Sequence, residues 1–152
     1  MKYGLNLGCG RDICKSNDEW TWFNVDIVKL EGVDYVYDLN KMPYLFNKEP
    51  LDLIVMNDIL EHLKEPPMVI GECYRLLKKG GELRIKVVYF SHRYAWGDPT
   101  HLHAFSEVYF EFFCKKTRRR DYYYDFAFED IKTNFIYYDG DKIQAIEVIL
   151  TK

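Results

Sequence analysis

A short apolar run that ends in two closely spaced glycines constrains this chain most. Residues 3–7 are typical of a buried strand, and Gly8-Cys9-Gly10 follows at once. Because glycine lacks a β-carbon, it permits positive φ angles and lets the backbone turn sharply and approach a ligand. The stretch Leu7, Gly8, Cys9 and Gly10 therefore predicts a strand followed by a nucleotide-binding loop. Taken alone, such a glycine pair more often marks a simple turn.

Three later strand-like segments also end in side chains that can bind a ligand. A carboxylate roughly twenty residues after a glycine loop can accept hydrogen bonds from both hydroxyls of a ribose. The carboxyl ends of parallel strands meet at one edge of a sheet, so these groups are expected to line one crevice with the glycine loop. In chain order the candidate residues are Asp26, Asp38, Leu39, Asn57 and Asp58.

In the order and spacing of these groups, residues 2–88 resemble the class I S-adenosylmethionine-dependent methyltransferases, and among them the compact type 11 group. The resemblance implies S-adenosylmethionine as the cofactor and methyl transfer as the reaction. The implied contacts are Gly8-Cys9-Gly10 with the methionine part, Asp26 with the ribose, and Asp38-Leu39 with the adenine, while residues 58–63 match the segment after the fourth strand.

The resemblance also implies an α/β fold with a Rossmann-like sheet of strand order 3-2-1-4-5-7-6 and an antiparallel last strand. The end of the chain agrees, because strand-like runs over 126–138 and 142–150 flank Asp139-Gly140, a dipeptide favoured in tight hairpins. Residues 11–22 and 29–33 show no sustained helical period. Several crossover helices are therefore expected to be missing or shortened.

Two amphipathic helices are expected on the sheet. Pro66-Pro67 begins the first, and the basic and glycine residues 78–81 end it. Residues 82–88 then alternate in polarity and predict the fifth strand. Ser106 can cap the second helix, which residues 115–116 close as a basic last turn.

Two positions depart from the pattern of the resembling family. Asn6 stands where an acid is usual, and Asp12 stands where a third glycine is common. We expect Asn6 to weaken the network that holds the glycine loop and Asp12 to turn the chain away from it in an unusual direction. Together with the missing helices, these departures leave open a non-catalytic S-adenosylmethionine-binding subunit that supports or regulates a partner. A nicotinamide enzyme fits less well, because the loop opens no evident helix.

Methyl transfer from a sulfonium is an in-line displacement, so the protein must align donor and nucleophile and in some cases remove a proton. Asn57 and Asp58 are expected beside the methyl group, where they could bind the methionine ammonium. His62 is expected to be packed rather than catalytic. Imidazole titrates near neutrality, so the loop after the fifth strand offers a general base, although each of its residues could instead anchor the loop. The candidate catalytic residues are His101, His103 and Asp98, with His92 as a further alternative.

No metal site is expected. The three histidines after the fifth strand lack a clear fourth zinc ligand, Asp98 aside, and the four cysteines lack paired C-x-x-C spacing and are expected to be reduced thiols. Residues 115–120 are basic and precede three tyrosines, a pattern that could hold phosphates and stack bases. We expect a solvated helix end there instead, so nucleic acid is not a favoured partner.

Length and charge bound the remaining possibilities. A chain of 152 residues with 48% hydrophobic residues suits a single domain over residues 1–152, and its net charge of −3 disfavours non-specific binding to nucleic acid or membranes. No apolar run approaches a membrane span and no signal-peptide pattern begins the chain, so a cytoplasmic protein acting on a small molecule is expected. The missing helices would leave one face of the sheet exposed. We expect Trp20 and Trp22 to cover part of this face and a second copy of the chain, in a homodimer, to cover the rest.

Overall fold

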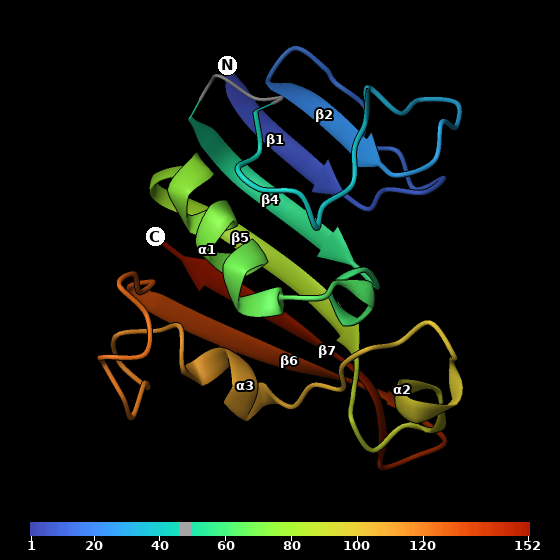
Figure 1. Ribbon diagram of the computed structural model, residues 1–152, viewed down its shortest axis with the longest axis vertical. Coiled ribbons are helices and arrows are strands. Elements are labelled where there is room, and N and C mark those ends of the chain that lie inside the picture. The colour runs from blue at the N-terminus through green and yellow to red at the C-terminus, as the bar shows by residue number, and fades with distance from the viewer. Residues whose placement is uncertain (46–49) are drawn as a thin grey trace.

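The structure, a computed structural model, describes residues 1–45 and 50–152. Its described strands form one seven-stranded sheet of order β3-β2-β1-β4-β5-β7-β6 (Figure 1). The strands are β1 (Lys2–Leu7), β2 (Trp20–Asp26), β3 (Tyr35–Val36), β4 (Leu51–Asn57), β5 (Leu77–Val88), β6 (Asp130–Tyr138) and β7 (Lys142–Thr151). The predicted strand order is confirmed.

Strands β1 to β5 pair in parallel, and β6 and β7 form an antiparallel hairpin that joins the sheet at β5. The hairpin turn is the predicted one, since Asp139 has a φ of 46° and Gly140 a φ of 82°. Positive φ at both central residues matches the right-handed twist of the flanking strands. Strand β6 begins at Asp130, four residues later than the sequence pattern predicted.

One face of the sheet carries the hydrophobic core. Leu5, Leu7, Ile54 and Met56 alternate toward this face and pack with Ile70 of helix α1 (Pro66–Leu76). Each such buried side chain contributes about 1.5–3 kcal/mol relative to leaving it exposed. Figure 1 shows α1 lying across this face in front of β4 and β5. The remaining helices are short: the 3₁₀ turn η1 (Leu60–His62), α2 (Arg93–Gly97) and α3 (Glu107–Glu111).

The opposite face is less covered. Val55 and Ile149 stay partly exposed there among Arg84 and Glu147, which alternate out of the same strands. Over β1 and β2, the rings of Trp20 and Trp22 stack at a centroid distance of 5.4 Å. The Trp22 ring fills the space above Gly4, where an added β-carbon would lie 2.5 Å from it. These tryptophans therefore cover part of the face, as expected.

The first crossovers lack helices among the described residues, as predicted: β1 leads to β2, and β2 to β3, through turns and loops alone. The first amphipathic helix was predicted correctly at Pro66 but not at its end. Helix α1 stops at Leu76, and β5 begins at Leu77 and includes the two lysines and two glycines that were assigned to the helix terminus. Leu77 pairs with Leu51 of β4, and the Gly80 amide donates to the Lys152 carbonyl. Pairing with two neighbouring strands thus overrides the local helix-stop pattern.

The second predicted helix is also shorter than expected. Helix α3 ends at Glu111 rather than near Lys115, and Ser106 precedes it without a capping hydrogen bond from its side chain. The Lys115 amide instead donates to the Phe128 carbonyl, which ties the following segment to the chain before β6. No helix in the described ranges combines the length and apolar character that crossing a membrane requires.

Candidate functional site

The glycine loop follows β1 directly and is shaped by two residues with positive φ. Gly8 has a φ of 66°, and a β-carbon there would lie 2.3 Å from the side chain of Ile59, so only glycine fits. Gly10 has a φ of 51°, and a β-carbon there would meet nothing within 4 Å. Leu7 is fully buried. The loop therefore packs tightly against the segment after β4 on one side and leaves space above Gly10 on the other.

Asp26, the last residue of β2, holds this loop. Its Oδ2 accepts a hydrogen bond from the Gly10 amide at 2.8 Å, and its Oδ1 accepts one from the Val28 amide at 2.9 Å. Each carboxylate oxygen has a further lone pair, and the side chain is only partly buried. The arrangement fits the ribose-binding role implied by the sequence, because the acid is oriented by two amides and can still accept hydroxyl protons.

Cys9 lies between the two glycines with 4% of its surface exposed. Burial, and then the nearby negative charge of Asp26, raise the pKa of its thiol to about 11. The thiol is therefore neutral at physiological pH and is a packing residue of the loop. The other described cysteines, Cys14, Cys73 and Cys114, are also free thiols.

Asn6 makes hydrogen bonds beside the glycine loop. Its Nδ2 donates to the Asp12 carbonyl at 2.7 Å and to Oδ1 of Asn24 at 3.1 Å. Asn24 in turn accepts from the Cys14 amide at 2.9 Å. These bonds hold the segment after the glycine loop across β1 and β2. An amide donates these two hydrogen bonds where a carboxylate could only accept, so Asn6 supports this segment, and its expected effect on the glycine loop stays a prediction.

Asp38 and Leu39 follow β3 and differ in exposure. Oδ1 of Asp38 accepts from the backbone amide of Asn40 at 3.0 Å, and this bond lowers the pKa of the carboxyl. Leu39 is 4% exposed, and its carbonyl accepts a hydrogen bond from the Tyr44 hydroxyl. The Leu39 side chain belongs to the core, so this residue can offer a ligand only its backbone and the edge of its side chain.

Asn57 and Asp58 end β4 and are both exposed. Asp58 adopts a φ of 52°, and its Oδ2 lies 2.8 Å from Nζ of Lys86 on β5. The Asp58 amide donates to the Lys86 carbonyl. The Asp58 side chain is therefore paired across the strand ends, while Asn57 is exposed and lines a hollow with Val55 and Arg84 on the less covered face.

The loop after β5 places its histidines in different surroundings. Nδ1 of His101 lies 3.3 Å from the Ala95 carbonyl, and its Nε2 lies 3.8 Å from Oδ2 of Asp98. His103 has Nε2 at 3.2 Å from the Lys64 carbonyl. His92 is buried and packs its ring against Tyr138. The structure thus joins His101 to Asp98 and separates both from His92.

A cluster that the sequence did not suggest lies beside His101. The backbone carbonyl of Glu61 accepts from the Leu102 amide at 2.8 Å, which ties the loop to η1. The ring centroids of His62 and His101 lie 4.7 Å apart, and Glu61 is 2% exposed, with no hydrogen-bond partner for either carboxylate oxygen among residues 1–45 and 50–152. Burial raises the pKa of the Glu61 carboxyl. This grouping could have been predicted, because each of these residues follows the carboxyl end of β4 or β5, and the carboxyl ends of parallel strands meet at one edge of the sheet.

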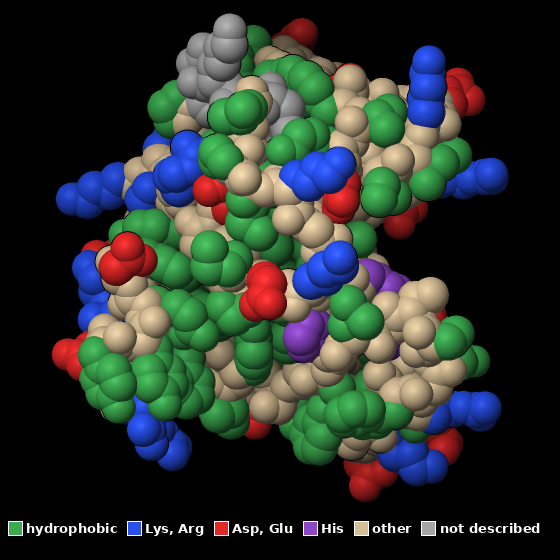
Figure 2. Space-filling view, in the orientation of Figure 1, with side chains coloured by type: hydrophobic (Ala, Val, Ile, Leu, Met, Phe, Trp, Pro, Cys, Tyr) green, Lys and Arg blue, Asp and Glu red, His purple; other side chains and the backbone are tan. Residues whose placement is uncertain are grey.

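The surface is hollowed near these residues. Figure 2 shows histidine side chains beside a notch between the surface over β1 and β2 and the surface over α2, on the side toward which the parallel strands point in Figure 1. A hollow of about 540 Å³ reaches Asp58, Lys86 and His92 on the less covered face.

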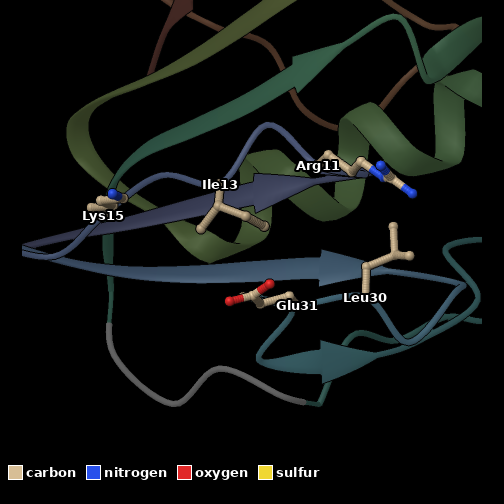
Figure 3. Close-up of a pocket in the computed structure, with 6 residues that line it drawn as sticks. Arg11, Ile13, Lys15, Leu30 and Glu31 are labelled. Carbon is tan, nitrogen blue, oxygen red and sulfur yellow. The ribbon is translucent and has the colours of Figure 1, made fainter.

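A larger hollow of about 620 Å³ lies between the two helix-free crossovers (Figure 3). Its lining includes Arg11, Ile13, Leu30 and Glu31 and none of the predicted cofactor residues. It therefore marks the thin cover of this face of the sheet rather than the crevice at the strand ends.

The family described as "Methyltransferase domain" matches residues 5–85, which is more than half of the chain. No curated protein matches the sequence of this chain. Among solved structures, a SAM-dependent methyltransferase from Archaeoglobus fulgidus superposes with a TM-score of 0.71 at 19% identity, covering 99% of this chain and 86% of the other. The N-methyltransferase NodS from Bradyrhizobium japonicum, solved with S-adenosylhomocysteine, gives 0.66 at 13% identity, with 99% and 78% covered.

A third structure, the 1,6-didemethyltoxoflavin-N1-methyltransferase of Burkholderia thailandensis with bound 1,6-didemethyltoxoflavin and S-adenosylhomocysteine, gives a TM-score of 0.66 at 13% identity, with 99% and 70% covered. At these identities the likenesses concern the fold. The family match, the strand order and the Asp26-anchored glycine loop agree with one another. The chain therefore belongs to the class I S-adenosylmethionine-dependent methyltransferases, whose cofactor is S-adenosylmethionine.

Proposed function

We propose that this chain transfers the methyl group of S-adenosylmethionine to a small-molecule acceptor that binds beside the loop after β5. The observation that carries the proposal is the Asp26 carboxylate, which is held by the Gly10 and Val28 amides and has lone pairs left for a ribose. A small acceptor is supported by the Burkholderia structure of the same fold, which binds 1,6-didemethyltoxoflavin.

The cofactor contacts follow the strand ends. We assign the methionine part to Leu7, Gly8, Cys9 and Gly10, the ribose to Asp26, and the adenine to Asp38 and the backbone of Leu39. The methionine ammonium is assigned to Asn57 and to the backbone of Asp58, because the Asp58 carboxylate is paired with Lys86. The Gly8 turn lies close against the Ile59 side chain, so the loop and the segment after β4 are in contact.

Bound S-adenosylmethionine supplies a methyl carbon on a positively charged sulfur. A lone pair of the acceptor forms the new bond as the carbon–sulfur bond breaks, which leaves S-adenosylhomocysteine and a proton to be removed from the acceptor. We assign proton removal to His101, with Asp98 as its partner. When Nδ1–H of His101 donates to the Ala95 carbonyl, Nε2 carries the lone pair that can accept a proton. His103 is the weaker candidate, because its Nε2 faces the Lys64 carbonyl.

The test measures turnover of S-adenosylmethionine and does not require that the acceptor be known. Purified protein is incubated with methyl-labelled S-adenosylmethionine and a cell extract separated into small-molecule, protein and nucleic-acid fractions, and S-adenosylhomocysteine is measured with and without each fraction. We expect product that depends on a fraction and disappears in Asp26→Ala. Label recovered in a protein or nucleic acid, rather than a small molecule, would contradict the acceptor class.

A second function rests on the thin cover of the sheet. The helix-free crossovers and the partly exposed Val55 and Ile149 suit a subunit that binds S-adenosylmethionine and supports a partner without catalysis. This reading expects tight binding of the cofactor but no S-adenosylhomocysteine with any fraction, even in whole-cell extract. Fraction-dependent turnover excludes it.

A further inference from the structure

We propose that Glu61, His62 and His101 form a binding site for one divalent first-row transition-metal ion. These residues come from two loops that follow β4 and β5, nearly forty positions apart in the chain. Each offers one ligand atom, and these atoms all lie within 4.8 Å of one another. Two ligands of a tetrahedral ion, each at about 2.1 Å from it, are themselves about 3.4 Å apart. The described side chains are therefore close to the spacing that an ion would impose.

The Glu61 carboxylate is the strongest sign of a missing partner. It is 2% exposed, and neither of its oxygens has a hydrogen-bond partner among the described residues. An ionised carboxylate buried without a partner costs several kcal/mol, so buried carboxylates are paired or bind metals. In the described part of the chain no lysine or arginine forms an ion pair with Glu61, because each ion pair there joins other residues. An ion between Glu61 and the histidines would satisfy it.

Both histidines are held as metal ligands usually are. Nδ1 of His101 lies 3.3 Å from the Ala95 carbonyl, and Nδ1 of His62 lies 3.3 Å from the Thr100 carbonyl. Nδ1 of His62 also lies 3.1 Å from the Thr100 hydroxyl. When Nδ1–H donates to such an oxygen, the lone pair of the ring is on Nε2. Asp98 lies 3.8 Å from Nε2 of His101 and could complete the set or hold a bound water. The sequence pattern had grouped His101 with His92 and His103, which lie outside this cluster.

The donor set indicates the class of ion. Two imidazoles and one carboxylate suit Zn²⁺, Fe²⁺, Co²⁺ or Mn²⁺ better than Mg²⁺ or Ca²⁺, which prefer oxygen ligands throughout. Three protein ligands leave at least one position open, as in catalytic rather than structural zinc sites. An acceptor oxygen or nitrogen could take that position and have its pKa lowered by the ion. This role of the ion in catalysis rests on the proposed methyl transfer, and His101 would then be a metal ligand instead of the general base. Binding of the ion does not depend on methyl transfer.

The test measures binding without cofactor or acceptor. Chelator-treated protein is dialysed against Co²⁺, bound metal is quantified, and the visible absorption of Co²⁺ is recorded. We expect one ion per chain and a spectrum of low coordination number with nitrogen ligands. Mutation of a residue that only hydrogen-bonds to a metal ligand weakens metal binding by about 10- to 100-fold. Loss of a direct ligand should weaken Co²⁺ binding by more than this. Glu61→Gln and His101→Ala are the test variants, and His103→Ala, in the same loop but outside the cluster, is the matched control.

Folding does not confound this test. Glu61→Gln keeps the shape of the side chain and removes a buried charge that has no partner, so the metal-free variant should melt no lower than wild type. The melting-temperature increase on adding Co²⁺ should be lost in Glu61→Gln and kept in His103→Ala. No stoichiometric binding by wild type, or equal binding by all three variants, overturns the metal site. Neither result would contradict the proposed methyl transfer. Conversely, metal binding without turnover of any acceptor would contradict methyl transfer and support the metal site.

Discussion

Replacement of Asp26 by alanine tests the cofactor site most directly. The carboxylate accepts hydrogen bonds from the amides of Gly10 and Val28 and is expected to accept two more from a ribose. A hydrogen bond to a charged group is worth about 1.5–3 kcal/mol, so loss of even one ribose contact should weaken S-adenosylmethionine binding by about 10- to 150-fold, and loss of both by more. The apo protein should also lose about 1–2 kcal/mol, because the two amides lose their acceptor.

These energies convert into a thermal shift. With an unfolding entropy of about 2.1 cal/mol/K per residue, the chain loses or gains roughly 3 °C per kcal/mol. Ligand at about a hundred times its dissociation constant adds about 2.7 kcal/mol, or roughly 8 °C, to wild type. At the same ligand concentration Asp26→Ala should gain about 4 °C at most, and about 1 °C or less if the loss of affinity reaches about 150-fold. Differential scanning fluorimetry gives the shifts, and isothermal calorimetry gives the two dissociation constants.

Asp52 provides the matched control. Its Oδ2 accepts from the Tyr3 amide at 2.9 Å near the amino end of β1, and its Oδ1 is paired with Lys78. Asp52→Ala should lower the melting temperature of the apo protein yet leave the ligand-induced shift unchanged. If Asp26→Ala binds S-adenosylmethionine within about twofold of wild type, or if Asp52→Ala loses binding equally, the assignment of the ribose to Asp26 is refuted.

Four further predictions concern other parts of the site. Because the pKa of Cys9 is raised to about 11, its alkylation by iodoacetamide at pH 8 should be about 200-fold slower than that of a free thiol, and fast modification would contradict its burial. The stability that its neutral thiol contributes should be full below about pH 8.5 and should fall as the pH rises to about 11. Gly8→Ala should cost about 2–5 kcal/mol from strain and overlap, whereas Gly10→Ala should cost about 1–2 kcal/mol but weaken cofactor binding, which urea titration and calorimetry distinguish. His101→Ala should lower kcat by about 10²–10⁴-fold with cofactor affinity unchanged, and an equal loss of both would mark a structural role. Sedimentation at micromolar concentration should show a homodimer through the face of the first two crossovers, and a lone monomer would mean that the loops cover that face by themselves.

Local sequence determined the features that depend on single residues with special backbone geometry. Gly8 and Gly10 were identified as a ligand loop because positive φ and close approach demand glycine, and both have positive φ. Asp139-Gly140 specified the hairpin for the same reason. The strand order itself came from the family resemblance of the first half of the chain, and the structure confirms it.

Tertiary structure decided where pairing and packing compete with local pattern. The residues from Leu77 to Gly81 read as a helix terminus, yet they extend β5 because Leu51 and Lys152 offer backbone partners there. The shortness of α3 has a similar cause, since the chain after it pairs with the segment before β6. Propensity acts over a few neighbours, and a long-range backbone pairing outweighs it.

The Glu61, His62 and His101 cluster shows the same division at the site. A chain pattern can mark each residue as polar and near a strand end, but it cannot show that the Glu61 carboxylate is buried with no hydrogen-bond partner in the described part of the chain. That fact depends on the bond between the Leu102 amide and the Glu61 carbonyl, which brings the loop after β5 onto η1. The sequence around β1 and β2 was therefore enough to indicate the cofactor, whereas the Glu61, His62 and His101 cluster exists only because two distant loops meet.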